Sequence, residues 1–224
     1  MTEKQLVYNI LNLQAGGRLS DDFIPSYSQI LFMVKYVRAM FIRRDLSQNW
    51  ALSKLYEQDL GELKLIPVDK SECPDLELGI TILRTEKKLP RFVRLKEKDG
   101  ITFAGAIDKQ SKWDLILSER SQFIGSSKYT SSVPRVYYQN GYAYVVGTNE
   151  FAYMNIRGIL TDPEDANRFL CTGEACFTSE SEYPLPDDMV QPMTDLILSK
   201  EMNFMLRTAQ DKENNTVNDK DAPR

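Results

Sequence analysis

Histidine is absent from all 224 residues of this sequence. Without an imidazole there can be no Ser-His-Asp or Cys-His catalytic machinery, and no His-ligated zinc, copper, iron or haem. The phosphate-binding patterns GxGxxG and GxxxxGK[ST] are missing as well. These absences exclude most familiar hydrolase and nucleotide-binding chemistries. We therefore expect no catalytic residues, no metal site and no cofactor.

Cysteine is scarce, because the only thiols are Cys73, Cys171 and Cys176. They lack a C-x-x-C spacing, and any single disulfide would leave one of them unpaired. Neither a zinc ribbon nor a disulfide framework is therefore expected. The pattern favours a reducing compartment in which free thiols act as small apolar side chains.

Excess positive charge and long apolar runs are also missing. The 28 basic residues are outnumbered by 32 acidic ones, so no global field draws the chain to nucleic acid or to an anionic membrane. Residues 30–42 form the most apolar run, but it is too short to cross a bilayer and contains Lys35 and Arg38. The first ten residues do not resemble a signal peptide. We expect a protein without a membrane partner, located in the cytoplasm or in an assembly made there.

Hydrophobic periodicity predicts helices near both ends of the chain. A short amphipathic helix is expected over residues 3–14, capped by Thr2. A second helix is expected over 26–45, where apolar residues occur on all sides and predict a central helix packed on several neighbours. Helical signals resume at Asp162 and again at Pro186.

Between about residues 63 and 159, short segments of β-branched and aromatic residues alternate with turn signals and predict a β region. Asn140-Gly141 and Asp99-Gly100 are dipeptides that tight hairpin turns prefer. The first predicts a hairpin of residues 136–138 with 142–146. The second predicts a hairpin of residues 91–96 with 101–107.

One local positive patch interrupts the acidic background. Residues 84–98 hold seven basic and two acidic side chains. They could make the chain a nucleic-acid-binding module, but the alternation of charged and apolar residues favours a half-exposed or edge strand over contact with DNA. The candidate residues for contact with DNA or a neighbouring protein are Lys87, Lys88, Arg91 and Arg94.

Carboxylate pairs leave open an enzyme that works with acidic residues alone. They occur at Asp21-Asp22, at Asp187-Asp188 and at Glu57 with Asp59. The first two pairs fall where helices are predicted to begin, and carboxylates there stabilise the helix dipole. A capping role is therefore favoured over catalysis. Tyrosines between residues 137 and 153 suit sheet packing or a subunit interface better than a ligand platform.

The order of segments resembles the head-to-tail connector (ring or adaptor) proteins of crAss-like podoviruses that infect gut Bacteroidales. The similarity runs from about residue 6 to residue 215. It is carried by GRLSDDFIPSYSQILFMVKYVRAMFIRRD, CPDLELG, LPRFVRL, ITFAGAIDK, YAYVVG, MNIRGILTDPEDA, YPLPDDMVQPMTDLILSKEM and DKENN, in that order. No single piece is a chemical signature.

The resemblance implies a non-enzymatic virion structural protein at the head-tail junction. Such connectors form twelve-subunit rings beneath the portal, extend the DNA channel and receive the tail. Expected partners are copies of the chain, the portal, adjacent ring or tail proteins, and double-stranded DNA that passes through the lumen without sequence-specific binding. A different ring or tail protein of the same virion is the alternative.

The fold implied by the resemblance is α+β, with a helical ring-forming body, a central antiparallel β domain and an extended polar C-terminal tail. The expected division is a helical part over 1–60, a β-rich domain over 61–160, a helical part over 161–206 and a partner-docking tail over 207–224. The last stretch is too polar to bury much surface by itself. Its candidate portal-docking residues are Phe204, Met205, Leu206, Arg207, Lys212, Asn214 and Asn215.

Overall fold

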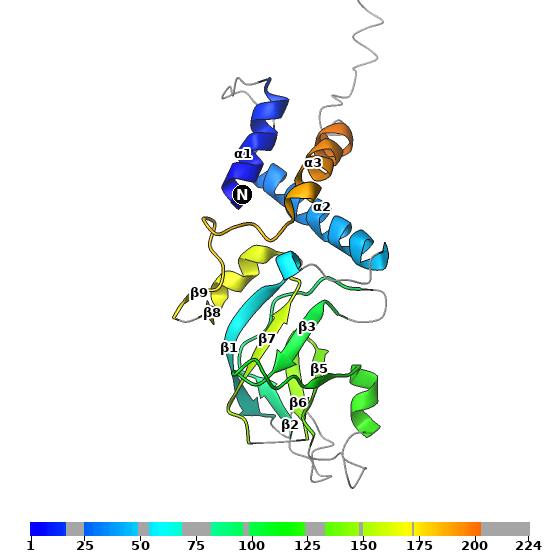
Figure 1. Cartoon of the computed structure of the whole chain (residues 1–224), viewed down its shortest axis with the longest axis vertical. Helices are drawn as coiled ribbons and strands as arrows, with labels where there is room; N and C mark the ends of the chain where they lie inside the picture. The colour runs from blue at the N-terminus through cyan, green and yellow to red at the C-terminus, as the bar shows by residue number, and fades with distance from the viewer. Residues whose placement is uncertain are drawn as a thin grey trace, which may run out of the picture.

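The computed structural model describes residues 1–16, 25–48, 54–68, 82–95, 99–123, 133–147, 150–171 and 173–202. Within these ranges the protein is elongated and mixed α+β, as expected, with α-helices at one end and a large β sheet at the other (Figure 1). None of the helices in these ranges combines the length and the apolar character that crossing a membrane requires.

Helix α1 (Glu3–Gln14) begins at Thr2, the predicted cap, which forms a capping box with Gln5. The Gln5 backbone N–H donates to the Thr2 hydroxyl over 3.3 Å, and the Thr2 N–H donates to the Gln5 side chain over 3.0 Å. Leu6, Val7 and Ile10 are fully buried on its inner face. This face holds α1 against the second helix.

Helix α2 (Tyr27–Gln48) confirms the predicted second helix, and its apolar stripe of Ile30, Val34 and Val37 is fully buried. It is not surrounded on all sides, however. Phe32 and Met40 are exposed, so the prediction of a helix packed all round is wrong. Among the described residues, neighbouring elements cover only one side of α2, and the opposite side faces outward.

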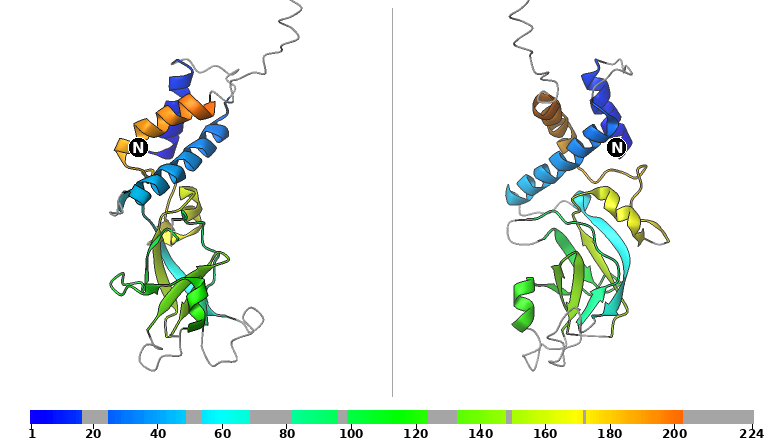
Figure 2. Two further views of the ribbon diagram at one scale, coloured as in Figure 1. Left: turned by 90° about the vertical axis from the view of Figure 1, so that its right-hand side faces the viewer. Right: turned by 180° about the vertical axis from the view of Figure 1, so that it is seen from behind.

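Helix α3 (Asp187–Leu196) follows Pro186 and continues as the π-helical segment η5 (Ile197–Met202). Met193 and Ile197 are fully buried and belong to the same core as α1 and α2. Figure 2 shows α1 and α3 on one side of α2, whose other side is uncovered when the molecule is seen from behind. The helical end is therefore two layers deep.

The described strands form a seven-stranded sheet in the order β3-β7-β1-β2-β6-β5-β4. The predicted antiparallel arrangement holds for every pair in this sheet except β4 and β5, which run parallel. The strands are β1 (Gln58–Pro67), β2 (Ile82–Thr85), β3 (Ile101–Gly105), β4 (Asp114–Leu115), β5 (Arg135–Gln139), β6 (Tyr142–Val146) and β7 (Tyr153–Gly158).

The hairpin predicted at Asn140-Gly141 is confirmed as β5 and β6. Both turn residues have positive φ, 53° and 84°, which is the geometry of a type I′ turn. The hairpin predicted at Asp99-Gly100 is only partly correct. A single bridge joins Arg94 to Asp99, but β3 takes β7 as its neighbour instead of residues 91–96.

The sheet curls until its two edge strands meet, and so closes into a small barrel. The segment between β3 and β4 closes it, because the Trp113 N–H donates to the Ala104 carbonyl over 2.8 Å on one side. On the other side the Ile116 N–H donates to the Val136 carbonyl over 2.9 Å. Short 3-10 helices flank the barrel, namely η1 (Lys54–Tyr56), η3 (Ser118–Phe123) and η4 (Pro163–Arg168).

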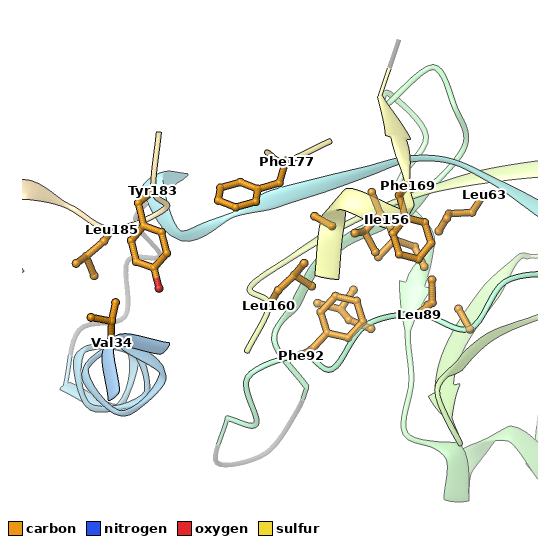
Figure 3. Close-up of a cluster of buried hydrophobic side chains, with 14 of the residues drawn as sticks. Val34, Leu63, Leu89, Phe92, Ile156, Leu160, Phe169, Phe177, Tyr183 and Leu185 are labelled. Atoms are coloured by element: carbon orange, nitrogen blue, oxygen red, sulfur yellow. The ribbon is translucent and has the colours of Figure 1, made fainter. Parts of the chain in front are cut away.

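A single apolar core joins the barrel to the helices. Figure 3 shows Phe92, Ile156 and other barrel side chains at one end of this cluster and Val34 of α2 at the other. Phe177, Tyr183 and Leu185 lie between them on the segment that leads to α3 (Figure 3). This segment therefore fills the space between the two ends of the molecule.

The two strands β8 (Leu170–Cys171) and β9 (Glu174–Ala175) form a small hairpin beside β1. A disulfide bond joins Cys171 to Cys176 across it. The prediction of free thiols is therefore wrong for this pair, while Cys73 lies outside the described residues. The sequence spacing did not indicate this disulfide bond. Two cysteines that are five residues apart can form a bond only where a tight turn brings their sulfur atoms together, and the spacing alone does not show that turn.

Candidate assembly surface

The predicted portal-docking residues cannot be placed. The described part of the chain ends at Met202, on the helical end of the molecule (Figure 1). Phe204, Met205, Leu206, Arg207, Lys212, Asn214 and Asn215 all lie outside the described residues.

The four predicted basic contact residues lie on the segment that follows β2. Lys87, Lys88, Arg91 and Arg94 are all exposed. Backbone hydrogen bonds fix this segment to the barrel: the Leu89 N–H donates to the Gly141 carbonyl over 2.7 Å, and the Arg91 carbonyl accepts from Thr161 N–H over 2.9 Å. The cationic side chains therefore project from an anchored backbone.

The groove beside this segment carries both signs of charge. It measures about 470 Å³ and includes Lys88, Arg91 and Arg168 on its walls. Asp162 and Asp165 line the same groove, and Asp165 pairs with Arg168 at 3.3 Å. Double-stranded DNA presents only negative phosphates, so acidic walls would repel it. The mixed charge suits a protein partner better.

The predicted carboxylate pairs do not converge on one place. Asp187 and Asp188 begin α3, which agrees with a capping role, and Asp21-Asp22 lies outside the described residues. Among the residues that the structure describes, no three His, Cys, Asp or Glu side chains are grouped to hold a metal ion.

Asp59 is the most extensively bonded of the candidate carboxylates, and its contacts are structural. Its side chain accepts hydrogen bonds from Asn155 (2.6 Å), the Gly61 N–H (2.8 Å) and Lys109 (2.6 Å). Partial burial acts against ionisation, but these hydrogen bonds prevail and lower the pKa of Asp59. The carboxylate thereby fixes an irregularity in β1, between Asp59 and Glu62, where the register with β7 shifts.

A charged cluster joins the helices to the barrel. Lys35 of α2 donates to Asp162 over 3.0 Å and also contacts Glu164 of η4. Burial opposes its positive charge, but the hydrogen bonds to Glu164 and Asp162 raise the pKa of Lys35. Glu3 of α1 is almost fully buried beside these groups, and one of its oxygens has no hydrogen-bond partner. Burial, reinforced by the charge of Glu164, raises the pKa of Glu3 to about 7.

Glu3 should make the stability of the subunit depend on pH. Its pKa in the folded state lies above the ordinary 4.5, so the folded protein binds the proton more tightly than the unfolded chain. Stability therefore falls as the pH rises from about 4.5 to 7. The glutamine side chain of Glu3→Gln cannot ionise. The substitution should therefore raise the free energy of unfolding by roughly 1–2 kcal/mol at pH 8, a value that allows for screening by water near the cluster. At pH 4.5 it should change the free energy of unfolding little.

Urea unfolding of both proteins at the two pH values measures this difference. Glu62→Gln, which alters an exposed carboxylate on β1, is the matched control and should show no such gain. An equal effect of Glu3→Gln at both pH values would contradict the prediction.

Arg38 of α2 forms a second polar link at the same junction. Its side chain is fully buried and donates to the Leu160 carbonyl over 2.8 Å and to the Pro184 carbonyl over 3.0 Å. The guanidinium also lies 5.6 Å from the centre of the Tyr183 ring. No sequence pattern indicates this role, because a single arginine in an apolar helix is more typical of the solvent-facing side.

Comparison with known proteins points to one family. A family model described as phage tail ring protein 2 matches residues 5–220 of the chain. Ring protein 2 of Bacteroides phage crAss001 is 23% identical over 237 aligned residues, which cover 98% of each of the two chains.

Proposed function

The chain belongs to the phage tail ring protein 2 family, and from this premise we propose that it is a head-to-tail connector ring beneath the portal of a crAss-like phage. The family assignment makes it a structural component of the virion. The finer proposal is that the ring extends the DNA channel and attaches the tail, with no catalytic step.

The observation that carries this proposal is the full-length match to a ring protein, because it covers both the helical end and the barrel. The elongated shape supports it, since a connector must contact one component at each end (Figure 2). We assign the ring body to the helical parts within 1–60 and 161–206. The β-rich part within 61–160 then projects towards the next ring.

We propose that twelve copies close the ring around DNA that slides through the lumen. The net charge of −4 fits a channel that does not grip phosphates. The exposed residues Lys87, Lys88, Arg91 and Arg94 would then contact an adjacent ring, because acidic residues share the groove that Lys88 and Arg91 line. This assignment is preferred to a nucleic-acid-binding module for the same reason.

The segment that follows Met202 is proposed to dock on the portal. Phe204, Met205 and Leu206 would fill apolar pockets, while Arg207, Lys212, Asn214 and Asn215 would bond to portal backbone or acidic groups. The described chain ends on the helical end of the molecule, so the docking segment starts from there (Figure 1).

Deleting residues 207–224 should leave a folded subunit whose co-assembly with the portal drops at least about tenfold, because the polar contacts of Arg207, Lys212, Asn214 and Asn215 are lost. Electron microscopy of the subunit mixed with its portal measures the fraction of portals that carry a coaxial ring. A shorter deletion of residues 216–224 keeps every docking candidate and should assemble normally. Full occupancy by the longer deletion would refute the docking role.

A further inference from the structure

The outward side of α2 carries a row of large apolar side chains. Phe32, Tyr36 and Met40 are 71%, 57% and 42% exposed, respectively. They are spaced four residues apart, so they stack along one side of the helix over successive turns. We call these three residues the α2 row.

Within the part of the chain that the structure describes, the fold of one subunit does not account for the α2 row. The buried side of α2, with Ile30, Val34 and Val37, already packs on α1, α3 and the segment before α3. The row lies on the opposite side, which Figure 2 shows uncovered in the view from behind. Contiguous exposed apolar side chains of this kind mark protein interfaces.

Two positively charged side chains lie beyond one end of the α2 row. Arg43 and Arg44 are both exposed, and they follow Met40 along the helix. Any surface that covers the row therefore needs apolar area for the row itself and negative charge beyond it.

The outward side of α3 has this combination. Asp188 and Asp195 are exposed there, and Pro192 between them presents an exposed apolar ring. Because α3 packs on the inner side of α2, its outward side faces away from the α2 row (Figure 2). The subunit thus presents two different, complementary surfaces on opposite sides of its helical end.

We propose that the α2 row of one subunit docks on the outward side of α3 in the next copy of the chain. Phe32 and Tyr36 pack on Pro192, and Arg43 and Arg44 face the acidic residues of α3. Two different surfaces on opposite sides generate a head-to-tail contact, which closes into a ring when the rotation between subunits is right. This inference rests on the proposed ring and specifies its subunit contact.

Charge exchange tests whether these two surfaces meet. Arg43→Glu with Arg44→Glu should weaken ring formation on the portal at least about tenfold, because the new carboxylates face the acidic side of α3. Asp188→Lys with Asp195→Lys should do the same from the other side. The protein that carries all four substitutions should recover rings, because every subunit then has complementary surfaces of reversed sign.

Phe32→Asp tests the apolar part independently of α3. It should reduce ring formation about 30-fold or more while leaving the thermal unfolding midpoint of the subunit near the wild-type value, since Phe32 is mostly exposed. Leu170→Asp is the matched control. It introduces the same charge at a residue 58% exposed on β8, away from the helical end, and should form rings normally.

The outcomes separate this inference from the proposed function. Rings that form normally with Phe32→Asp, or that are not recovered by the four-fold charge exchange, would overturn the α2–α3 contact while the ring proposal stands. If free rings of Phe32→Asp form away from the portal but do not join it, the α2 row is assigned to the portal instead. A wild-type subunit that forms no ring on the portal would overturn both.

Discussion

Replacing Arg38 by alanine should lower the free energy of unfolding of the subunit by about 3 kcal/mol. The substitution leaves the carbonyls of Leu160 and Pro184 without their donor in a place that water cannot easily reach. It also removes the aliphatic stem that fills the space beside Tyr183. Part of this loss is offset, because a buried charge is costly and burial lowers the pKa of Arg38.

Two further variants separate these contributions. Arg38→Met keeps most of the stem and removes the charge and both donors, so it should cost less than alanine but still about 1–2 kcal/mol. Arg38→Lys keeps a charge but cannot reproduce the fork that reaches two carbonyls, so it should not restore stability. Urea titrations provide the comparison. If methionine is as stable as arginine, the hydrogen bonds are not what joins the helices to the barrel.

The helices illustrate how far local patterns reach. The cap at Thr2 and the helix that carries Ile30, Val34 and Val37 depend on local features, and both were predicted correctly. The outward position of Phe32 was also available, because it lies on the side of the helix opposite that stripe. A periodic pattern does not show how many neighbouring elements pack on a helix. The number of apolar residues in α2 therefore suggested more neighbours than the helix has.

Arg38 shows the opposite limit. It lies within the buried sector of α2, but its two acceptors come from the residues just after β7 and from the segment before α3, 122 and 146 residues further along the chain. A buried arginine is stable only where such carbonyls converge. That convergence is a property of the tertiary fold and has no local sequence signal.

The sheet likewise has some features that local sequence determines and others that depend on tertiary contacts. Asn140-Gly141 fixes its hairpin because the turn residues themselves require positive φ. Asp99-Gly100 did not fix a hairpin, because β7 offers β3 a longer pairing than residues 91–96 do. Barrel closure through Trp113 and the bond between Cys171 and Cys176 likewise depend on contacts that the order of residues does not display.

The candidate surface was predicted in part. The basic residues from Lys87 to Arg94 were found by composition, and the structure adds that Asp162 and Asp165 share the groove that Lys88 and Arg91 line. The family resemblance pointed to a ring, but it could not say which sides of a subunit meet. The α2 row and the acidic side of α3 became apparent only when exposure and the arrangement of the helices were known together.

Gly61 lies where the β8–β9 hairpin crosses closest to β1. Its φ is +66°, and a Cβ atom there would sit 2.0 Å from the carbonyl oxygen of Leu170. The same residue donates to Asp59 and accepts from Asn155 over 2.9 Å. Any side chain at this position must therefore displace the hairpin or break the hydrogen bonds that hold the irregularity in β1.

Gly61→Ala should consequently lower the free energy of unfolding by at least about 3 kcal/mol. This loss is the sum of backbone strain at positive φ and a clash of the new Cβ atom with main-chain atoms. Gly16→Ala is a close control, because Gly16 has a similar φ of +60° but nothing within 4 Å of a Cβ atom. It should cost only about 1 kcal/mol, from strain alone. Thermal and urea unfolding of the two variants isolate the clash, because the strain is common to both. Equal losses would mean that the hairpin moves aside freely and that its contact with β1 contributes little to the barrel.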